Sequence, residues 1–138
     1  MECRVHKLIA DVAVLAEGHV LLVKYRDVKK YDGQRGWFLP DDFLEHEEHP
    51  DDAAQRIVRE QAGVDRPEVR LGLIESFGNG AWHLVFHYIT EIEERATPRP
   101  GENVEQAEWF DVKNLPAPKE MAHHGWGRDV LQRMGVET

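Results

Sequence analysis

The sequence has little of what marks disulfide-stapled, membrane-spanning or nucleic-acid-binding proteins. Cys3 is the only cysteine in 138 residues, which excludes a disulfide framework and a zinc site built on several cysteines. The longest apolar stretch, residues 8–16, contains Asp11 and falls short of the roughly 20 residues that a membrane-spanning helix needs. The sequence has 17 Lys and Arg residues and 26 Asp and Glu residues, which gives a formal charge of −9. This negative charge disfavours binding to the backbone of a nucleic acid.

Size and composition indicate one ordinary globular domain over residues 1–138. Apolar residues make up 41% and charged residues 31%. A chain of this length buries enough surface to form a core without disulfide bonds or structural metals. Residues 8–16 follow Arg4 and Lys7 as in a signal peptide, but the internal aspartate spoils the apolar region. Because the single cysteine also suits a reducing compartment, we expect a cytoplasmic protein.

The N-terminal half predicts a hairpin, a loop, a short strand and a helix. Apolar runs at residues 9–15 and 20–25 flank a turn at Gly18, which is typical of a hairpin. Residues 26–36 are polar and predict a loop, and residues 37–39 predict a short strand that Pro40 stops. Residues 50–62 predict the best helix, because Pro50 suits its first position and Gly63 its end.

The C-terminal half predicts a second hairpin, a last strand and a last helix. Residues 69–77 and 81–92 are joined through Gly78-Asn79-Gly80, a strong hairpin signal. Both faces of residues 81–92 are largely apolar, so we expect a central strand covered on both sides. Residues 107–110 predict a strand and residues 127–134 a helix.

Acidic residues crowd the segment that leads into the first predicted helix. No Lys or Arg lies between Arg35 and Arg56, and Arg56 and Glu60 share a helix face at i, i+4 spacing. One interpretation is a solvated loop before a well-capped helix. The other is a site for Mg²⁺ or Mn²⁺, because clustered carboxylates repel and hard oxygen ligands suit these cations. Seven of the 26 acids belong to this segment: Asp41, Asp42, Glu45, Glu47, Glu48, Asp51 and Asp52.

Residues 42–64 resemble the Nudix box of MutT-like Nudix hydrolases. The family pattern is G-x5-E-x7-R-E-U-x-E-E-x-G-U, where U is bulky and apolar. The strand before the box and the late Trp109-Phe110-Asp111 also resemble the family. The resemblance implies an α+β Nudix fold, a mixed β-sheet sandwiched between helices (α/β/α). The positions that match in register are Glu48, Arg56, Val58, Glu60, Gly63 and Val64.

The box departs from the family pattern at several positions. Asp41 and Asp42 stand where the family has glycines. Ile57 and Gln61 replace two of the three helix glutamates that bind cations in the family. Asn103 stands where the family often has another acid. Ile57 cannot bind a metal at all, and Gln61 offers only a neutral carbonyl.

The resemblance implies divalent-metal-dependent hydrolysis of a nucleoside diphosphate linked to another group, which could be a nucleotide sugar. The expected metal ligands are Glu48, Glu60 and Asp42, holding Mg²⁺ or Mn²⁺, with Asp41 as a spare ligand. The expected catalytic residues are Glu60, Glu45 as general base, and Arg56 as the orienting partner of Glu48. The alternative is a catalytically inactive module of the same fold that binds a nucleotide or sugar phosphate. Ile57, Gln61 and Asn103, which stand in place of acids, are what decay of a metal site would leave.

Partners and the roles of further side chains follow from the same resemblance and from spacing. We expect a small phosphorylated nucleotide-type substrate and neither nucleic acid nor membrane, and a homodimer is left open. His46 and His49 lie among the acids, where histidine either joins a metal or is only a loop residue. His83 and His87 lie about 13 Å apart along one strand, too far to chelate one zinc, and are expected in the core or a pocket. Five aromatic residues either stack on a base or fill the core, which we expect for most of them: Trp37, Phe43, Phe77, Trp82 and Trp126.

Overall fold

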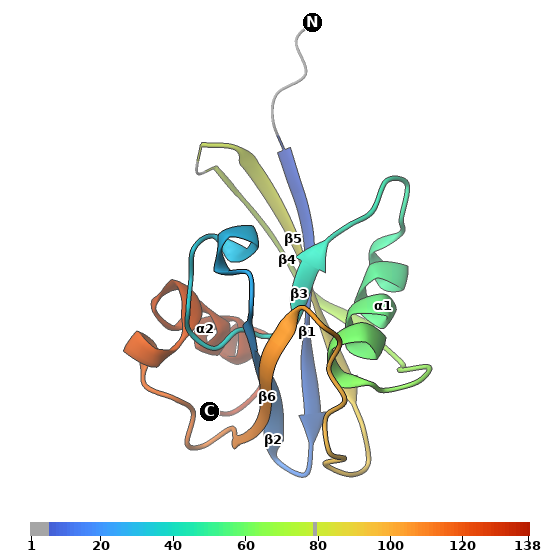
Figure 1. Ribbon diagram of the computed structural model, residues 1–138, viewed down its shortest axis with the longest axis vertical. Coiled ribbons are helices and arrows are strands. Elements are labelled where there is room, and N and C mark those ends of the chain that lie inside the picture. The colour runs from blue at the N-terminus through green and yellow to red at the C-terminus, as the bar shows by residue number, and fades with distance from the viewer. Residues whose placement is uncertain (1–5, 79) are drawn as a thin grey trace, which may run out of the picture.

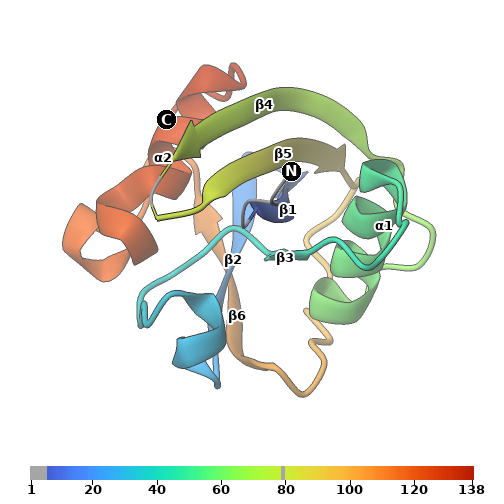
Figure 2. The same ribbon diagram turned by 90° about the horizontal axis from the view of Figure 1, so that it is seen from above.

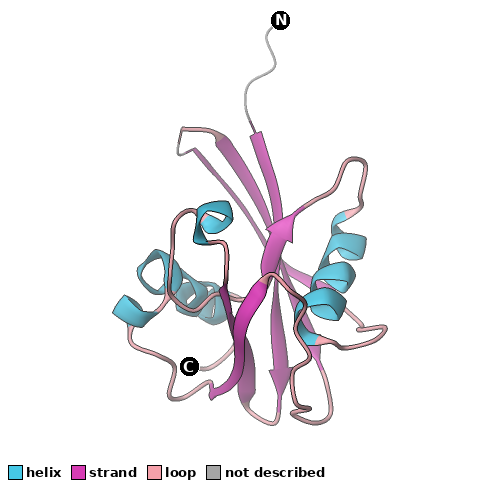
Figure 3. Cartoon of the chain, in the orientation of Figure 1, coloured by secondary structure: helices cyan, strands magenta, loops and turns pink. Residues whose placement is uncertain are grey.

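The computed structural model describes residues 6–78 and 80–138, which fold around one mixed sheet (Figures 1 and 3). Cys3, Arg4 and Asn79 lie outside the described residues. In the described part the sheet has six strands. They are β1 (His6–Ala16), β2 (His19–Tyr25), β3 (Asp41–Phe43), β4 (Arg70–Gly78), β5 (Trp82–Glu91) and β6 (Val104–Asp111).

Strand β1 is the organising strand, because it pairs with three others. The strand order is β4-β5-β1-β2-β6, with β3 paired to β1 beside that path. β5 runs parallel to β1 along nearly its whole length, whereas all other pairs are antiparallel. β3 pairs with the first half of β1, where Asp11 is opposite Asp41, and β2 pairs with its last residues.

The two helices cover opposite faces of this sheet (Figure 2). They are α1 (Pro50–Ala62) and α2 (Trp126–Arg133), and three short 3₁₀ turns are η1 (Val28–Tyr31), η2 (Pro118–Glu120) and η3 (Ala122–Gly125). Alternate residues of β1 serve two cores, since Val12 packs with Ile57 of α1 while Ala13 packs with Leu131 of α2. The α+β class and the α/β/α layering expected from the sequence are confirmed.

Helix α1 has the predicted bounds, with a cap that the sequence did not reveal. Pro50 occupies its first turn, and Gly63 ends it in the left-handed region with φ 74°. His49 caps the N-terminus, since its Nδ1 accepts the backbone N–H of Asp51 at 3.0 Å. Ser, Thr, Asp or Asn usually fill that position, so the histidine gave no capping signal.

One expectation about the sheet is wrong, and another holds in part, since β5 is central between β4 and β1 but is not covered along its whole length. Residues 37–39 form no strand in the described structure. Trp37 and Phe38 make isolated bridges to Met121 and Val23, and the strand comes after Pro40, at β3. Coverage of β5 begins only at Val85, and Val85, Tyr88 and Ile89 are buried. Its first residue, Trp82, is 53% exposed, because α1 and α2 reach only the other end of the strand.

The aromatic residues named in the sequence analysis also differ in burial. Trp37 is buried as expected, whereas Phe43, Phe77 and Trp82 are exposed instead of lying in the core. Among the described residues, no helix combines the length and the apolar character that crossing a bilayer requires.

Candidate functional site

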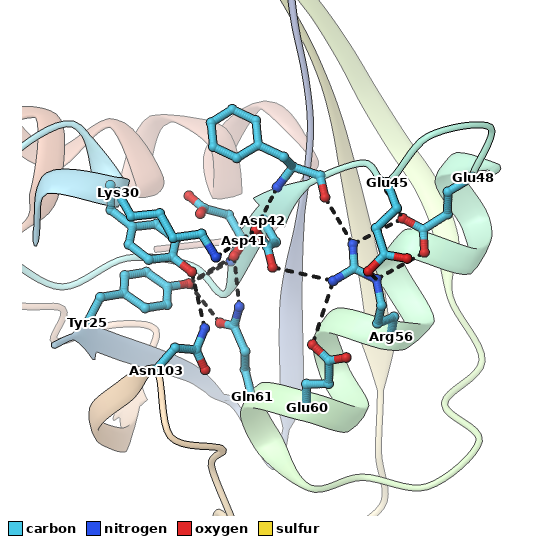
Figure 4. A network of polar contacts seen from close by, with 12 residues as sticks. Tyr25, Lys30, Asp41, Asp42, Glu45, Glu48, Arg56, Glu60, Gln61 and Asn103 are labelled. Carbon is cyan, nitrogen blue, oxygen red and sulfur yellow. Dashed lines mark hydrogen bonds and ion pairs between the residues drawn. The ribbon is translucent and has the colours of Figure 1, made fainter. Parts of the chain in front are cut away.

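Arg56 lies at the centre of the acidic segment, held there by α1 (Figure 4). Its guanidinium grips the carboxylate of Glu48 with two hydrogen bonds, Nε to Oε2 at 2.9 Å and Nη2 to Oε1 at 3.0 Å. Nη2 also donates to the backbone oxygen of Phe43 at 2.9 Å. This fork geometry ties the loop before α1 to the helix, which is the contact between Arg56 and Glu48 that the resemblance implied.

Three further carboxylates surround the same guanidinium. Asp42 lies 3.3 Å from Nη1, Glu60 lies 3.6 Å from Nη1, and Glu45 lies 3.8 Å from Nε. Glu48 and Asp42 lie at the inner side and are only partly accessible, with side chains 13% and 14% exposed. Glu60 and Glu45 are 53% and 70% exposed and face the solvent. The predicted site residues therefore do come together, in an inner and an outer pair.

The electrostatics of this cluster leave an excess of negative charge. The hydrogen bonds from Arg56 lower the pKa of Glu48, and the same carboxylate raises the pKa of Arg56. Lys30 adds a second positive charge, 3.7 Å from Asp42. Four carboxylates against two basic groups give a local charge of −2, so a phosphate group would be repelled unless a cation joined it.

The two substituted box positions face inward and carry no free ligand oxygen. Ile57 is completely buried among core residues such as Val12 and Leu21. Gln61 is 1% exposed. Its amide donates to the backbone oxygen of Asp41 at 2.8 Å, and its Oε1 accepts the hydroxyl of Tyr25 at 2.7 Å. Both oxygen and nitrogen of the Gln61 amide are thus used within the protein.

A neutral network of aromatic hydroxyls and amides extends from Gln61 (Figure 4). The ring of Tyr25 stacks on that of Tyr31 with centroids 3.5 Å apart, and the hydroxyl of Tyr31 accepts the Asn103 amide at 3.1 Å. Burial raises the pKa of Tyr31 to about 12, so its hydroxyl stays protonated. Gln61 and Asn103, two of the positions where the family would have acids, therefore belong to one uncharged unit that is joined by hydrogen bonds and by the stacked tyrosine rings.

The two histidines near the acids are either structural or exposed to solvent. His49 is the cap of α1, and His46 is 93% exposed beside Glu47. On the opposite face of the sheet, His87 is fully buried between Asp11 and Glu75, as expected of a core histidine. Neither group offers an extra ligand at Arg56.

The donor set at Arg56 suits a cation that is completed by other ligands. Within residues 6–78 and 80–138, no three or more His, Cys, Asp or Glu side chains are arranged to hold a metal ion by themselves. Mg²⁺ commonly takes only one or two carboxylates together with water and substrate phosphates. The solvent-facing oxygens of Glu60 and Glu45 meet that requirement, whereas both oxygens of Glu48 are already bound by Arg56.

The sequence model of the NUDIX domain family matches residues 5–134. The chain belongs to the NUDIX domain family. The match covers nearly the whole chain, which agrees with the resemblance of residues 42–64 to the Nudix box. A search of curated proteins finds no match.

Solved structures share the fold at low sequence identity. A MutT NUDIX hydrolase from Burkholderia pseudomallei aligns with a TM-score of 0.75 and 22% identity over 93% of this chain and 97% of that one. The dihydroneopterin triphosphate pyrophosphohydrolase of E. coli aligns with a TM-score of 0.73 and 16% identity, over 96% and 98%. The NUDIX domain of Shewanella oneidensis NrtR, complexed with ADP ribose, gives 0.73 and 16%, over 96% and 87%. At these identities the likeness extends to the fold alone.

Proposed function

We propose that this NUDIX domain hydrolyses a nucleoside diphosphate linked to another group, with the help of one divalent cation. The observation that carries the proposal is the outer pair of carboxylates, Glu60 and Glu45, set around a guanidinium that is already anchored to Glu48. The local excess of negative charge favours the binding of a cation. The same excess means that a diphosphate would bind only together with the cation.

The residues of the cluster divide the work of the proposed reaction, and Glu45 has two tasks. Glu60 and Glu45 hold the cation, which would neutralise the charge that develops on the diphosphate during attack by water. Glu45, the more exposed acid, takes the proton of the attacking water as the P–O bond breaks. Arg56 positions the loop through Glu48 and touches no substrate in this scheme, because its donors are committed within the protein.

Two relatives in fold support the class of ligand. One of these neighbours is a NUDIX domain complexed with ADP ribose, and the other is a pyrophosphohydrolase of dihydroneopterin triphosphate. Both ligands join a phosphate chain to a ring system. We propose a ligand of this general kind for the present chain, in a setting that is soluble and without nucleic acid or membrane as partner.

A second candidate function is a binding module without catalysis. It is favoured by Ile57, which is fully buried, and by Gln61, whose amide is fully hydrogen-bonded. These two positions can supply no charge to a metal, so the chain has fewer anionic ligands than the family pattern provides. A ligand could still bind in such a site without being turned over.

Glu60→Gln separates the two candidates. We would screen nucleoside diphosphate derivatives with Mg²⁺ and with Mn²⁺, reading phosphate or sugar release, and then compare the variant with the parent protein. A hydrolase should lose turnover at least about 100-fold in Glu60→Gln, while Glu108→Gln, an exposed acid on β6, should behave as the parent. Binding of a nucleotide without any release by the parent protein would favour the module instead.

A further inference from the structure

Strand β4 forms one edge of the sheet. The strand order β4-β5-β1-β2-β6 places β4 and β6 at its two ends, and of the strands that the structure describes only β5 pairs with β4. Figure 2 shows β4 as the outermost strand on its side of the sheet. An edge strand presents a row of backbone N–H and C=O groups with which a further strand can pair.

The side chains exposed along this edge are largely apolar. Leu71 is 47% exposed, Ile74 48% and Phe77 40%. Trp82, which begins β5, is 53% exposed, and its Nε1 donates to Oγ of Ser76 on β4 at 2.8 Å. Proteins commonly protect an edge strand from pairing with lysine or proline, and residues 70–78 contain neither. The edge at β4 is therefore suited to pairing.

Charge distinguishes the β4 edge from the β6 edge. Arg70 and Glu75 are the only charged residues of β4, and their charges cancel. The carboxylate of Glu75 is turned inward, 15% exposed, and bound by His87 and Arg133. β6 carries three acids and no basic residue: Glu105, Glu108 and Asp111. In a chain with a net charge of −9, a second copy is repelled less at β4 than at β6.

Helix α2 covers one face of β4 and leaves the other open. Arg133 donates to Glu75 at 2.7 Å, and Met134 lies against Gly72, where an added Cβ would be 2.6 Å from its Sδ. Ile74 is on the α1 face, because it is opposite a β5 residue that packs on the core beside α1. The open surface is thus the backbone edge together with the apolar side chains of the α1 face.

Symmetry limits how two β4 strands can pair antiparallel. A two-fold axis perpendicular to the sheet keeps the two faces, so directly opposite residues share a face. In the regular part of the strand, residues 73–78, an axis near the middle passes beside Ile74, Glu75 or Ser76. Glu75 on the axis would set two carboxylates opposite each other, which is destabilising. Ser76 on the axis would set Ile74 opposite Gly78, whereas an axis beside Ile74 packs this side chain against its own copy.

We propose that β4 pairs with β4 of a second copy of this chain, antiparallel about a two-fold axis beside Ile74, so that the two sheets continue into one. The homodimer that the sequence left open thereby has a defined surface. Residues 73–78 supply about 20 Å of paired edge. This is a small interface, so we expect a dissociation constant in the micromolar range. The proposal does not depend on the proposed function.

The first test is the mass of the full chain in solution, measured by sedimentation equilibrium over a range of concentrations. The parent protein should approach twice the mass of a single chain as its concentration rises. Ile74→Lys sets two ammonium groups opposite each other, and we expect the dissociation constant to rise at least about 100-fold. Gln106→Lys makes the same change of charge at an exposed residue of β6 and should leave it unchanged. Circular dichroism checks that both variants fold.

The second test introduces no charge and serves if Ile74→Lys does not fold. Ile74→Cys, made together with Cys3→Ser, should form a disulfide between two chains under mild oxidation. The Cα atoms of directly opposite residues are about 4.5–5.5 Å apart, which a disulfide can span. Ser76→Cys in the same background would be four residues out of register with its own copy and should not cross-link.

A parent protein that stays monomeric at every concentration would overturn the proposal. So would a dimer that persists unchanged in Ile74→Lys, or cross-linking through Ser76→Cys in place of Ile74→Cys. A monomer would leave this edge free or for a strand of a different protein. Because neither metal nor turnover enters these measurements, their outcome is separate from the hydrolase test.

Discussion

The two faces of the sheet each carry a group of charged residues, and the two groups are built in opposite ways. On the α1 face, Arg56 is the fixed cation, and its bonds lower the pKa of Glu48. On the α2 face, His87 is the cation. Burial opposes its charge, but the carboxylates of Asp11 and Glu75 outweigh that effect and raise the pKa of His87. Arg56 stays charged throughout the pH range of a folded protein, whereas His87 is a titratable cation.

The difference gives the two groups opposite pH dependence. Glu48 has a lowered pKa in the folded state, so its stabilisation is present above pH 4.5 and is lost as the pH falls through the folded-state value. His87 has a raised pKa, so its stabilisation is complete below pH 6.5 and is lost as the pH rises through the folded-state value. Lowering the pH therefore weakens the α1 face, and raising the pH weakens the α2 face.

Replacing Arg56 should have the largest effect on stability and should fall on the α1 face. Arg56→Met leaves the largely buried Glu48 without its counter-ion and leaves Asp42 with Lys30 alone. We expect a loss of about 3 kcal/mol in the free energy of unfolding at pH 7, measured by urea denaturation. Arg56→Lys keeps the charge but loses the two-bonded fork, and should lose clearly less. Equal losses in the two variants would mean that charge pairing contributes nothing here.

The sequence predicted the α1 face far better than the α2 face. Pro50 and Gly63 mark the helix ends by local chemistry, and the box spacing implied the pairing of Arg56 with Glu48. The contact between Asp11 and His87 joins residues that are distant in sequence and depends on the parallel register of β1 and β5. No local pattern encodes that register, so the contacts that join Asp11, His87, Glu75 and Arg133 on the α2 face could not be derived from the sequence.

The bonding of Gln61 was hidden for a similar reason. A glutamine in place of a glutamate looks like a weakened metal ligand when only the box is considered. Its actual partners come from β2 and β3, which approach α1 only in the folded sheet. Asp41 likewise looks like a spare ligand within the box, although the strand alternation places its carboxyl on the face away from Arg56.

Replacing His87 should have the next largest effect and should depend on pH. His87→Gln removes the positive charge between Asp11 and Glu75, although Arg133 still neutralises Glu75. We expect a loss of about 2 kcal/mol at pH 6. The difference from the parent protein should shrink as the pH rises through the folded-state pKa of His87, because the parent then loses its own imidazolium.

The control for this prediction is His46→Gln, whose parent side chain is 93% exposed. This variant should follow the parent protein at every pH. A constant difference between His87→Gln and the parent from pH 6 to pH 9 would show that the imidazole between the two carboxylates loses no proton over this range, and the predicted pH dependence of the α2 face would then be wrong.

Removing the hydroxyl of Tyr25 should have the smallest effect. It tests the uncharged unit of Tyr25, Gln61, Tyr31 and Asn103. The hydroxyl of Tyr25 accepts the backbone N–H of Asp41 at 2.8 Å and donates to Gln61 at 2.7 Å. Tyr25→Phe leaves both groups without this partner and keeps the ring stacked on Tyr31. We expect a loss of about 1–2 kcal/mol that does not vary between pH 5 and pH 9, since no charge is lost. Urea denaturation at several pH values measures it, with Tyr31→Phe as the matched removal of the neighbouring hydroxyl. Should Tyr25→Phe instead bind Mn²⁺ more tightly than the parent, followed by Mn²⁺ relaxation, then Gln61 freed from its bond is a metal ligand after all.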